Sequence, residues 1–168
     1  ASTITQQYAR NLFLNHEKTW YRKVSEAFYT IRIEMNYTKN EILEGYLNTI
    51  YYGHGVYGVQ AASHYYFGKS ADELALQEAA MLAGIPKGPS YYSPFKSYER
   101  AKSRQEIVLS AMEEAGYVTA EEVEEASKQP INLHTQTAEK VEIAPYYLQS
   151  VRQILKNDLK LDEQTISL

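Results

Sequence analysis

Short helix-starting motifs constrain the fold of this chain more than any other feature. In a capping box, a hydroxyl residue and a Glu or Gln three positions later satisfy the orphan backbone donors at the start of a helix. The pattern occurs at residues 3–6, 38–41, 70–73 and 119–122. Apolar residues recur at three- and four-residue spacing along the chain, and no long stretch alternates with the two-residue period of a strand. The sequence therefore predicts an all-α fold.

Two of the expected helices are rich in apolar residues. The stretch 20–35 carries a long apolar stripe at helical spacing, formed by Trp20, Val24, Ala27, Phe28, Ile31 and Met35. The motif at 70–73 is expected to begin a short helix rich in Ala and Leu. That helix should end at Gly84, because Pro86 follows closely.

Three glycines, Gly53, Gly55 and Gly58, interrupt the helical pattern. No strand pattern precedes them and no Lys-Ser or Lys-Thr pair follows, so a phosphate-binding loop is disfavoured. We expect a structural turn, because glycine adopts positive φ angles at little cost. His54 and His64 have no companion at a metal-ligand spacing, so we expect them to be structural or solvent-facing.

Composition limits the classes of function. The length of 168 residues fits one domain with a real core, and the absence of cysteine excludes disulfides and thiolate metal sites. The net charge of −4 hides an asymmetry: residues 1–40 hold six Lys/Arg and three Glu, a net of +3, whereas the remainder holds eleven Lys/Arg and eighteen Asp/Glu, a net of −7. A basic end on an acidic body favours a local anionic ligand over nucleic acid.

The basic end groups hydrogen-bond donors around one carboxylate. These residues are Thr3, Gln7, Arg10, Lys18, Arg22, Lys23 and Glu26. Their spacing allows two interpretations. One is a solvated helix face with an ordinary Arg22–Glu26 ion pair, worth about 0.3–0.5 kcal/mol. The other is an anion site suited to phosphate oxygens, in which neighbouring cations keep Glu26 ionised.

Four segments in a fixed order form a more specific pattern: STITQQYARN, RKVSE, EILEGYLNTIYYGHGVYGVQAASHYYFGK and LQEAAMLAGIPKGPSYYSP. Together they resemble motifs of glycosyltransferase family 51, the peptidoglycan polymerase domain of class A penicillin-binding proteins. The resemblance covers residues 1–130 and implies a lysozyme-like helical fold with a smaller membrane-proximal lobe. Residues 131–168 resemble the connector and helix that lead toward a transpeptidase domain, which this chain does not contain.

The resemblance implies a hexosyltransferase that polymerises lipid II into glycan strands in bacterial cell-wall synthesis. The 4-hydroxyl of one lipid II would attack the anomeric carbon of the growing chain and release undecaprenyl diphosphate with inversion. The implied partners are lipid II, the growing glycan, the membrane surface and a linked transpeptidase domain, with no nucleic acid. The implied location is the extracytoplasmic face of the cell membrane. No resident cofactor or metal is implied, and a divalent cation bound with the substrate diphosphate is left open.

The family's functional residues carry over one by one. Gln7 and Arg10 match residues that face the diphosphate-sugar, Lys18 and Lys23 match further phosphate-side cations, and Arg22 and Glu26 belong to the RKxxE motif. The family's general base is a glutamate of an earlier motif, which would lie upstream of Ala1. We therefore expect these residues alone to be nearly inactive. Glu26, the second carboxylate, is expected to orient donors rather than to abstract a proton.

Two other classes of function stay open at this point. A lysozyme-like hydrolase or lytic transglycosylase would share the fold, but it needs no diphosphate site, so the cations argue against it. A non-catalytic helical module could use the same cations to bind lipid phosphate or a partner protein. Binding of a donor mimic that depends on Arg10 and Lys23 would distinguish a substrate cleft from a docking surface.

Overall fold

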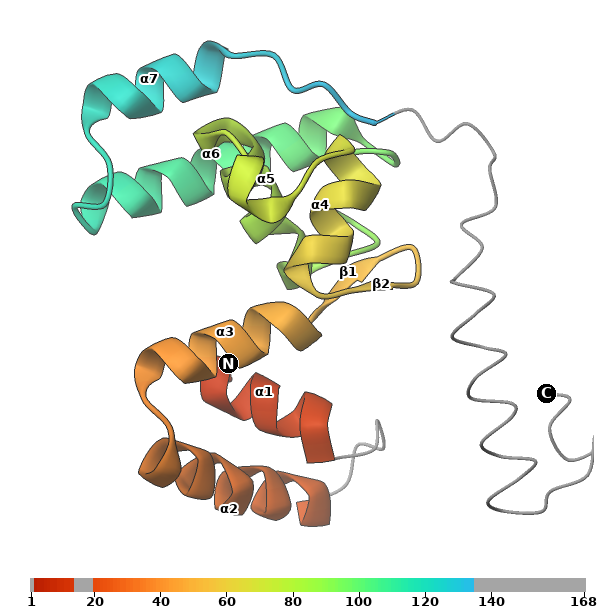
Figure 1. The fold of residues 1–168 in the computed structure, drawn as a ribbon, viewed down its shortest axis with the longest axis vertical. Coiled ribbons are helices and arrows are strands. Elements are labelled where there is room, and N and C mark those ends of the chain that lie inside the picture. Colours follow the sequence, from red (N-terminus) through yellow and green to blue (C-terminus); the bar gives the residue numbers. More distant parts are fainter. Residues whose placement is uncertain (1, 14–19, 135–168) are drawn as a thin grey trace, which may run out of the picture. The chain divides into compact units, whose positions relative to one another are not determined.

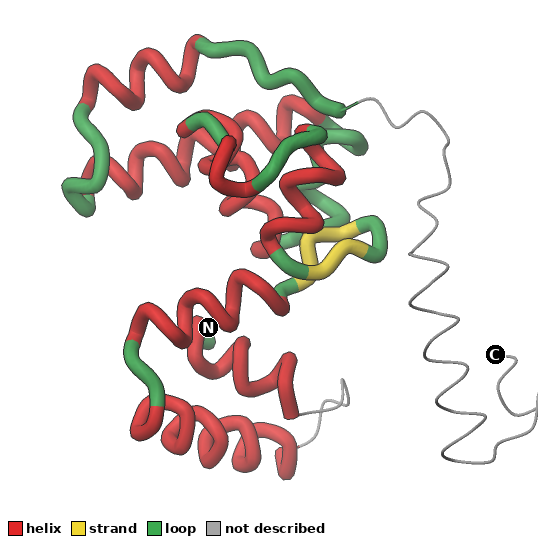
Figure 2. The backbone as a smooth tube through the Cα atoms, viewed as in Figure 1, coloured by secondary structure: helices red, strands yellow, loops and turns green. Residues whose placement is uncertain are grey.

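The computed structural model describes residues 2–13 and 20–134 (Figures 1 and 2). Within these residues the chain forms helices and one small hairpin, so the predicted all-α class is confirmed. The elements are α1 (Ile4–Phe13), α2 (Trp20–Asn36), α3 (Lys39–Thr49), β1 (Tyr51–Gly53), β2 (Val56–Tyr57), α4 (Val59–Phe67), η1 (Ala71–Glu73), α5 (Leu76–Gly84), η2 (Ile85–Lys87), α6 (Tyr98–Glu114) and α7 (Ala120–Lys128). The helix expected within 131–168 lies outside the described residues.

Capping boxes begin the helices where the sequence predicts them, with one exception. The boxes at 3–6, 38–41 and 119–122 start α1, α3 and α7. The box at 70–73 closes only the 3₁₀ turn η1, so the prediction that it begins α5 was wrong. α5 starts later, after Ala75, whose N–H donates to the carboxylate of Glu78 at 2.9 Å. Glu78, which lies in the first turn of α5, therefore determines where this helix begins, and Glu73 closes only η1.

The glycine-rich segment forms a hairpin as well as a turn. β1 and β2 pair antiparallel, with Tyr51 opposite Tyr57. Gly53, the last residue of β1, and His54 and Gly55 between the strands have φ angles of 90°, 54° and 78°. This left-handed region suits glycine, so the predicted turn is confirmed. The pairing was not predicted, because strands this short do not show a two-residue period.

Each of the two regions of the described chain has its own apolar clusters. α1, α2 and α3 share a small cluster of Ala9, Ile33 and Ile42. The region from the hairpin to α7 has a larger cluster of Ile50, Tyr52, Ala62, Tyr66, Phe67, Met81, Leu82, Ile85, Ala101 and Ile131, and a further one of Ala80, Leu109 and Ala126. Burial of apolar surface therefore stabilises the second region more than the first.

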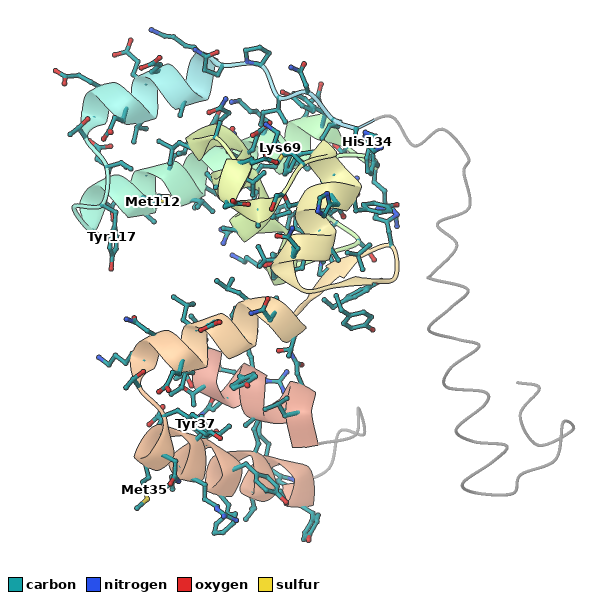
Figure 3. The ribbon with its side chains drawn as sticks, viewed as in Figure 1. Met35, Tyr37, Lys69, Met112, Tyr117 and His134 are labelled. Atoms are coloured by element: carbon teal, nitrogen blue, oxygen red, sulfur yellow. The ribbon has the colours of Figure 1, made fainter. Side chains whose placement is uncertain are left out.

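α2 does not pack with its most apolar face. Its buried residues are Glu26, Thr30 and Ile33, which follow one another at helical spacing. The predicted apolar stripe is instead exposed to solvent, with Trp20 89% and Met35 79% exposed. Met35 lies on the outer side of α2 (Figure 3). Exposed apolar residues along one helix face are typical of interaction surfaces. None of the described helices is long and apolar enough to span a membrane.

A candidate anion-binding site

Glu26 is the centre of the candidate site. Its side chain is 1% exposed. Arg10 Nε donates to Glu26 Oε2 at 3.1 Å, and Lys23 Nζ donates to Glu26 Oε1 at 2.6 Å. Arg10 comes from α1, whereas Lys23 lies one turn before Glu26 on α2. Two cations from neighbouring helices therefore bind the two oxygens of one buried carboxylate.

These contacts determine the ionisation of Glu26. Burial alone would raise the pKa of this carboxyl, because it disfavours the charged form. Hydrogen bonds from Lys23 and Arg10, together with their positive charges, outweigh burial and keep the pKa below its ordinary value of 4.5. Glu26 is therefore an anion at neutral pH. A carboxylate in this state orients its donors and is a poor proton acceptor.

Both cations keep part of their surface in solvent. The side chain of Arg10 is 34% exposed and that of Lys23 is 48% exposed. Arg10 also donates from Nη2 to Ser2 Oγ at 3.2 Å. These contacts use only part of the donor capacity of a guanidinium and an ammonium group. The three charged groups carry a net charge of +1, so the arrangement is suited to binding an anion with several oxygens.

Helix packing places Arg10 against Glu26. Ala9, next to Arg10, is completely buried, and its small side chain lets the helices approach closely. Thr30 Oγ1 donates to the backbone carbonyl of Glu26 at 2.7 Å, one turn further along α2. α3 also approaches α1, since a Cβ at Gly45 of α3 would overlap the ring of Tyr8 in α1. The absence of a side chain at Gly45 therefore brings α3 close to α1.

The structure joins some of the residues that the sequence singled out. Arg10, Lys23 and Glu26 are in direct contact. Gln7 lies one turn before Arg10, and its amide Nε2 donates to the carbonyl oxygen of Ser2 at 3.4 Å. Ser2 was not predicted to take part in the site. It precedes the first capping box, and no spacing rule links it to Arg10 before the chain is folded.

Three other predicted residues have different outcomes. Thr3 accepts a hydrogen bond from the backbone N–H of Gln6 at 3.2 Å and so caps α1, and its contact with a substrate stays a prediction. Lys18 lies outside the described residues. The side chain of Arg22 is likewise not described, so an Arg22–Glu26 pair stays a prediction.

No metal centre is found in the described part of the chain. These residues contain no group of three or more His, Asp or Glu side chains placed to hold a metal ion. His54 Nε2 lies 2.8 Å from Ser93 Oγ, and His64 Nε2 lies 3.1 Å from the amide nitrogen of Gln60. Both histidines therefore make structural contacts, in agreement with their sequence context.

Comparison with known proteins identifies the family. The model of the transglycosylase family matches residues 1–113, which include Arg10, Lys23 and Glu26. The chain belongs to the transglycosylase family. It is a glycosyltransferase domain of peptidoglycan synthesis, as the order of its motifs predicts.

Relatives of the chain are penicillin-binding proteins. Penicillin-binding protein 2D of Bacillus subtilis is 52% identical over 99% of this chain and 24% of its own length. Penicillin-binding protein 1A of Escherichia coli is 48% identical over 94% of this chain and 18% of its own length. A crystal structure of penicillin-binding protein 1A from Haemophilus influenzae matches with a TM-score of 0.55 and 33% identity, over 94% of this chain and 20% of that one. The chain thus spans about a quarter or less of these relatives.

Proposed function

We propose that this domain polymerises lipid II and that Arg10 and Lys23 bind the diphosphate of the substrate. The observation that carries the proposal is a pair of partly exposed cations fixed on one buried, ionised carboxylate. Because Glu26 holds both donors in place beforehand, little ordering is needed when the substrate binds. Their remaining N–H groups then stabilise the charge that develops on the leaving diphosphate.

The proposed reaction needs a separate proton acceptor. The 4-hydroxyl of the acceptor lipid II attacks the anomeric carbon, its proton passes to a general base, and undecaprenyl diphosphate leaves with inversion. Glu26 does not suit the role of base, because its pKa is lowered. We assign the base to the glutamate of the family's earlier motif, which would lie upstream of Ala1. Since a missing base costs about 10²–10⁴ in rate, we propose that residues 1–168 alone are nearly inactive.

The state of Glu26 argues against the hydrolase alternative. A lysozyme-like hydrolase needs a carboxylic acid that stays protonated near neutral pH, which requires a raised pKa. Glu26 has a lowered pKa and two cations in contact with its oxygens. Within the described residues, the arrangement therefore supports diphosphate binding better than glycan hydrolysis. A divalent cation could arrive with the diphosphate, and the site does not require one.

We further propose that the exposed stripe of α2 contacts the membrane in which the substrate is held. Trp20, Val24, Phe28, Ile31 and Met35 are between 58% and 89% exposed. An amphipathic helix with such a face lies in the lipid interface without crossing the bilayer. This contact would place the domain on the extracytoplasmic surface. The longer relatives support a linked transpeptidase domain, toward which residues 131–168 would lead.

Calorimetric titration with a soluble short-chain prenyl diphosphate tests the diphosphate site. Arg10→Gln and Lys23→Gln are each expected to weaken binding about tenfold, because each removes a charge-assisted hydrogen bond. Lys39→Gln at the start of α3 and Arg32→Gln on α2 are matched controls, since they remove the same charges away from Glu26. Equal weakening by the control variants would contradict a specific site.

Fluorescence tests the membrane contact directly, because Trp20 is the only tryptophan of the chain. We expect a blue shift of its emission on addition of anionic lipid vesicles. The double variant Phe28→Ser and Ile31→Ser should reduce vesicle binding severalfold through the loss of buried apolar area. Tyr117→Ser removes an aromatic ring that is 81% exposed in the other region, so it is the control. Unchanged binding by the double variant would disprove the membrane contact of α2.

A further inference from the structure

A second cluster of positive charge lies on α6, in the region of the hairpin and α4–α7. It forms one wall of a cleft of about 410 Å³. The other wall is the loop that follows η2. The side chains that matter here are Tyr91, Tyr92, Glu99, Arg100, Ser103 and Arg104. None of them belongs to the candidate diphosphate site.

Each arginine of the cleft lies over a tyrosine ring. The guanidinium carbon of Arg100 is 4.4 Å from the ring centre of Tyr91, and that of Arg104 is 5.9 Å from the ring centre of Tyr92. The two arginines are four residues apart on α6, so both guanidinium groups project from the same side of the helix. The tyrosine rings therefore hold the two guanidinium groups by cation–π contacts on one side of α6.

Neither guanidinium group has a hydrogen-bond or ion-pair partner among residues 2–13 and 20–134. The Nε–H of Arg104 is buried and still has no acceptor in this part of the chain. Buried donors in folded proteins nearly always have acceptors, so an unused one requires an explanation. Arginines that only pack against tyrosine would have their donors in water. Arg104 does not fit that description.

One glycine allows this arrangement. A Cβ on Gly84, the last residue of α5, would lie 2.8 Å from Cγ of Arg104. The aliphatic stem of Arg104 thus packs directly on the backbone of α5. Packing rather than hydrogen bonding fixes the side chain, which leaves its donors for a ligand.

We propose that this cleft binds a carboxylate of a short peptide. The fork of N–H donors on a guanidinium matches the two oxygens of a carboxylate. Glu99 reduces the net charge of the cleft to +1, which suits a monoanion better than a phosphate dianion. The exposed ring of Tyr91 offers a flat apolar surface to the adjoining peptide bond.

The source of this peptide rests on the proposed function. The substrate of that proposal is lipid II, which the family resemblance implies to be a disaccharide with a pentapeptide on undecaprenyl diphosphate. The free carboxylates of the peptide and the diphosphate are then different ends of the substrate. Arg100 and Arg104 would then bind the stem while Arg10 and Lys23 bind the diphosphate. The cleft thus selects substrates that carry an acidic peptide.

The test is an NMR titration of the isotope-labelled 168-residue chain, followed through the Nε–H signals of its arginines. The probes are acetyl-Ala-Ala-Ala with its terminal carboxylate free, the same peptide with that carboxylate converted to an amide, and inorganic phosphate. We expect the acidic peptide to shift the Arg100 and Arg104 signals in a saturable manner. The amidated peptide should bind at least about tenfold more weakly, because the charge-assisted hydrogen bonds are lost.

Variants complete the test. Arg100→Gln should weaken peptide binding about tenfold, and Arg104→Lys should weaken it while keeping the charge, because an ammonium lacks the fork of donors. Arg32→Gln is the matched control, since Arg32 also lies near an aromatic ring, Phe28, but on α2. Equal binding of the amidated peptide, tighter binding of phosphate, or equal weakening by Arg32→Gln would overturn the proposal.

Different results would disprove the diphosphate site and the peptide cleft. Prenyl diphosphate that binds independently of Arg10 and Lys23 would disprove the diphosphate site, while a carboxylate-dependent shift at Arg100 would still establish the peptide cleft. A normal diphosphate titration with no carboxylate dependence at Arg100 would disprove the cleft alone.

Discussion

Two buried glutamates show how the two regions of this domain differ. Glu26 in the α1–α3 region is paired with Lys23 at 2.6 Å, and Glu78 in the α4–α7 region is paired with Lys69 at 2.8 Å. Glu78 also accepts the N–H of Ala75 at the start of α5, so its carboxylate completes a helix. Glu26 instead receives a second cation, Arg10, from a different helix.

The difference extends to the surroundings of each residue. The buried amide of Gln105 in α6 donates to the backbone carbonyl of Gln77 in α5, next to Glu78, and so stabilises backbone between two helices. The region around Glu26 has a smaller apolar cluster and leaves much of α2 exposed. Buried charge in the second region thus supports the fold. In the first region it holds two partly exposed cations from two helices, which the proposed function uses to bind a ligand.

The largest expected effect comes from neutralising each glutamate in turn. Glu26→Gln should lower the free energy of unfolding by about 2 kcal/mol, less than for a fully buried pair because both cations reach solvent. Glu78→Gln should cost about 1 kcal/mol, since an amide oxygen still accepts the N–H of Ala75. Urea denaturation at neutral pH measures both. Equal losses, together with unchanged diphosphate binding by Glu26→Gln, would show that both residues are merely structural.

The pH dependence of the Glu26→Gln effect sharpens the comparison. The pKa of Glu26 is lower in the folded protein than its ordinary value of 4.5. Its ionised form therefore contributes stability that is fully present above about pH 4.5 and is lost as the pH falls through the lower folded value. The stability difference between the parent chain and the variant should shrink below this pH. A difference that stays constant from neutral pH into acid would contradict the assigned ionisation.

The smallest expected effect concerns the helix caps of the two regions. Thr119→Ala removes the cap of α7 and should cost about 1 kcal/mol. Thr3→Ala removes the cap of α1 and should cost about 0.5 kcal/mol, because its partner Gln6 carries no charge to favour the helix dipole, unlike Glu122. Thermal unfolding of both variants checks the order. A larger loss for Thr3→Ala would show that this residue does more than cap the helix.

Local features of the chain could be predicted from sequence because they depend on residues within about one turn of each other. The capping boxes at Thr38 and Thr119 follow from side chains three positions apart. The motif context singled out Arg10, Lys23 and Glu26, which the structure brings into contact, and their roles stay predictions. The start of α5 was mispredicted because two possible caps, Glu73 and Glu78, lie close together in the chain.

The sequence by itself determined the helices, the turn at the glycines and the concentration of positive charge near the start of the chain. Only the tertiary structure decided that Glu26 is buried against Arg10, sixteen positions earlier, and that α2 leaves its apolar stripe in solvent. The periodicity of a helix shows which residues share a face. Which face is buried depends on the neighbouring helices, and here Ala9 of α1 and Ile42 of α3 pack against the face that contains a carboxylate.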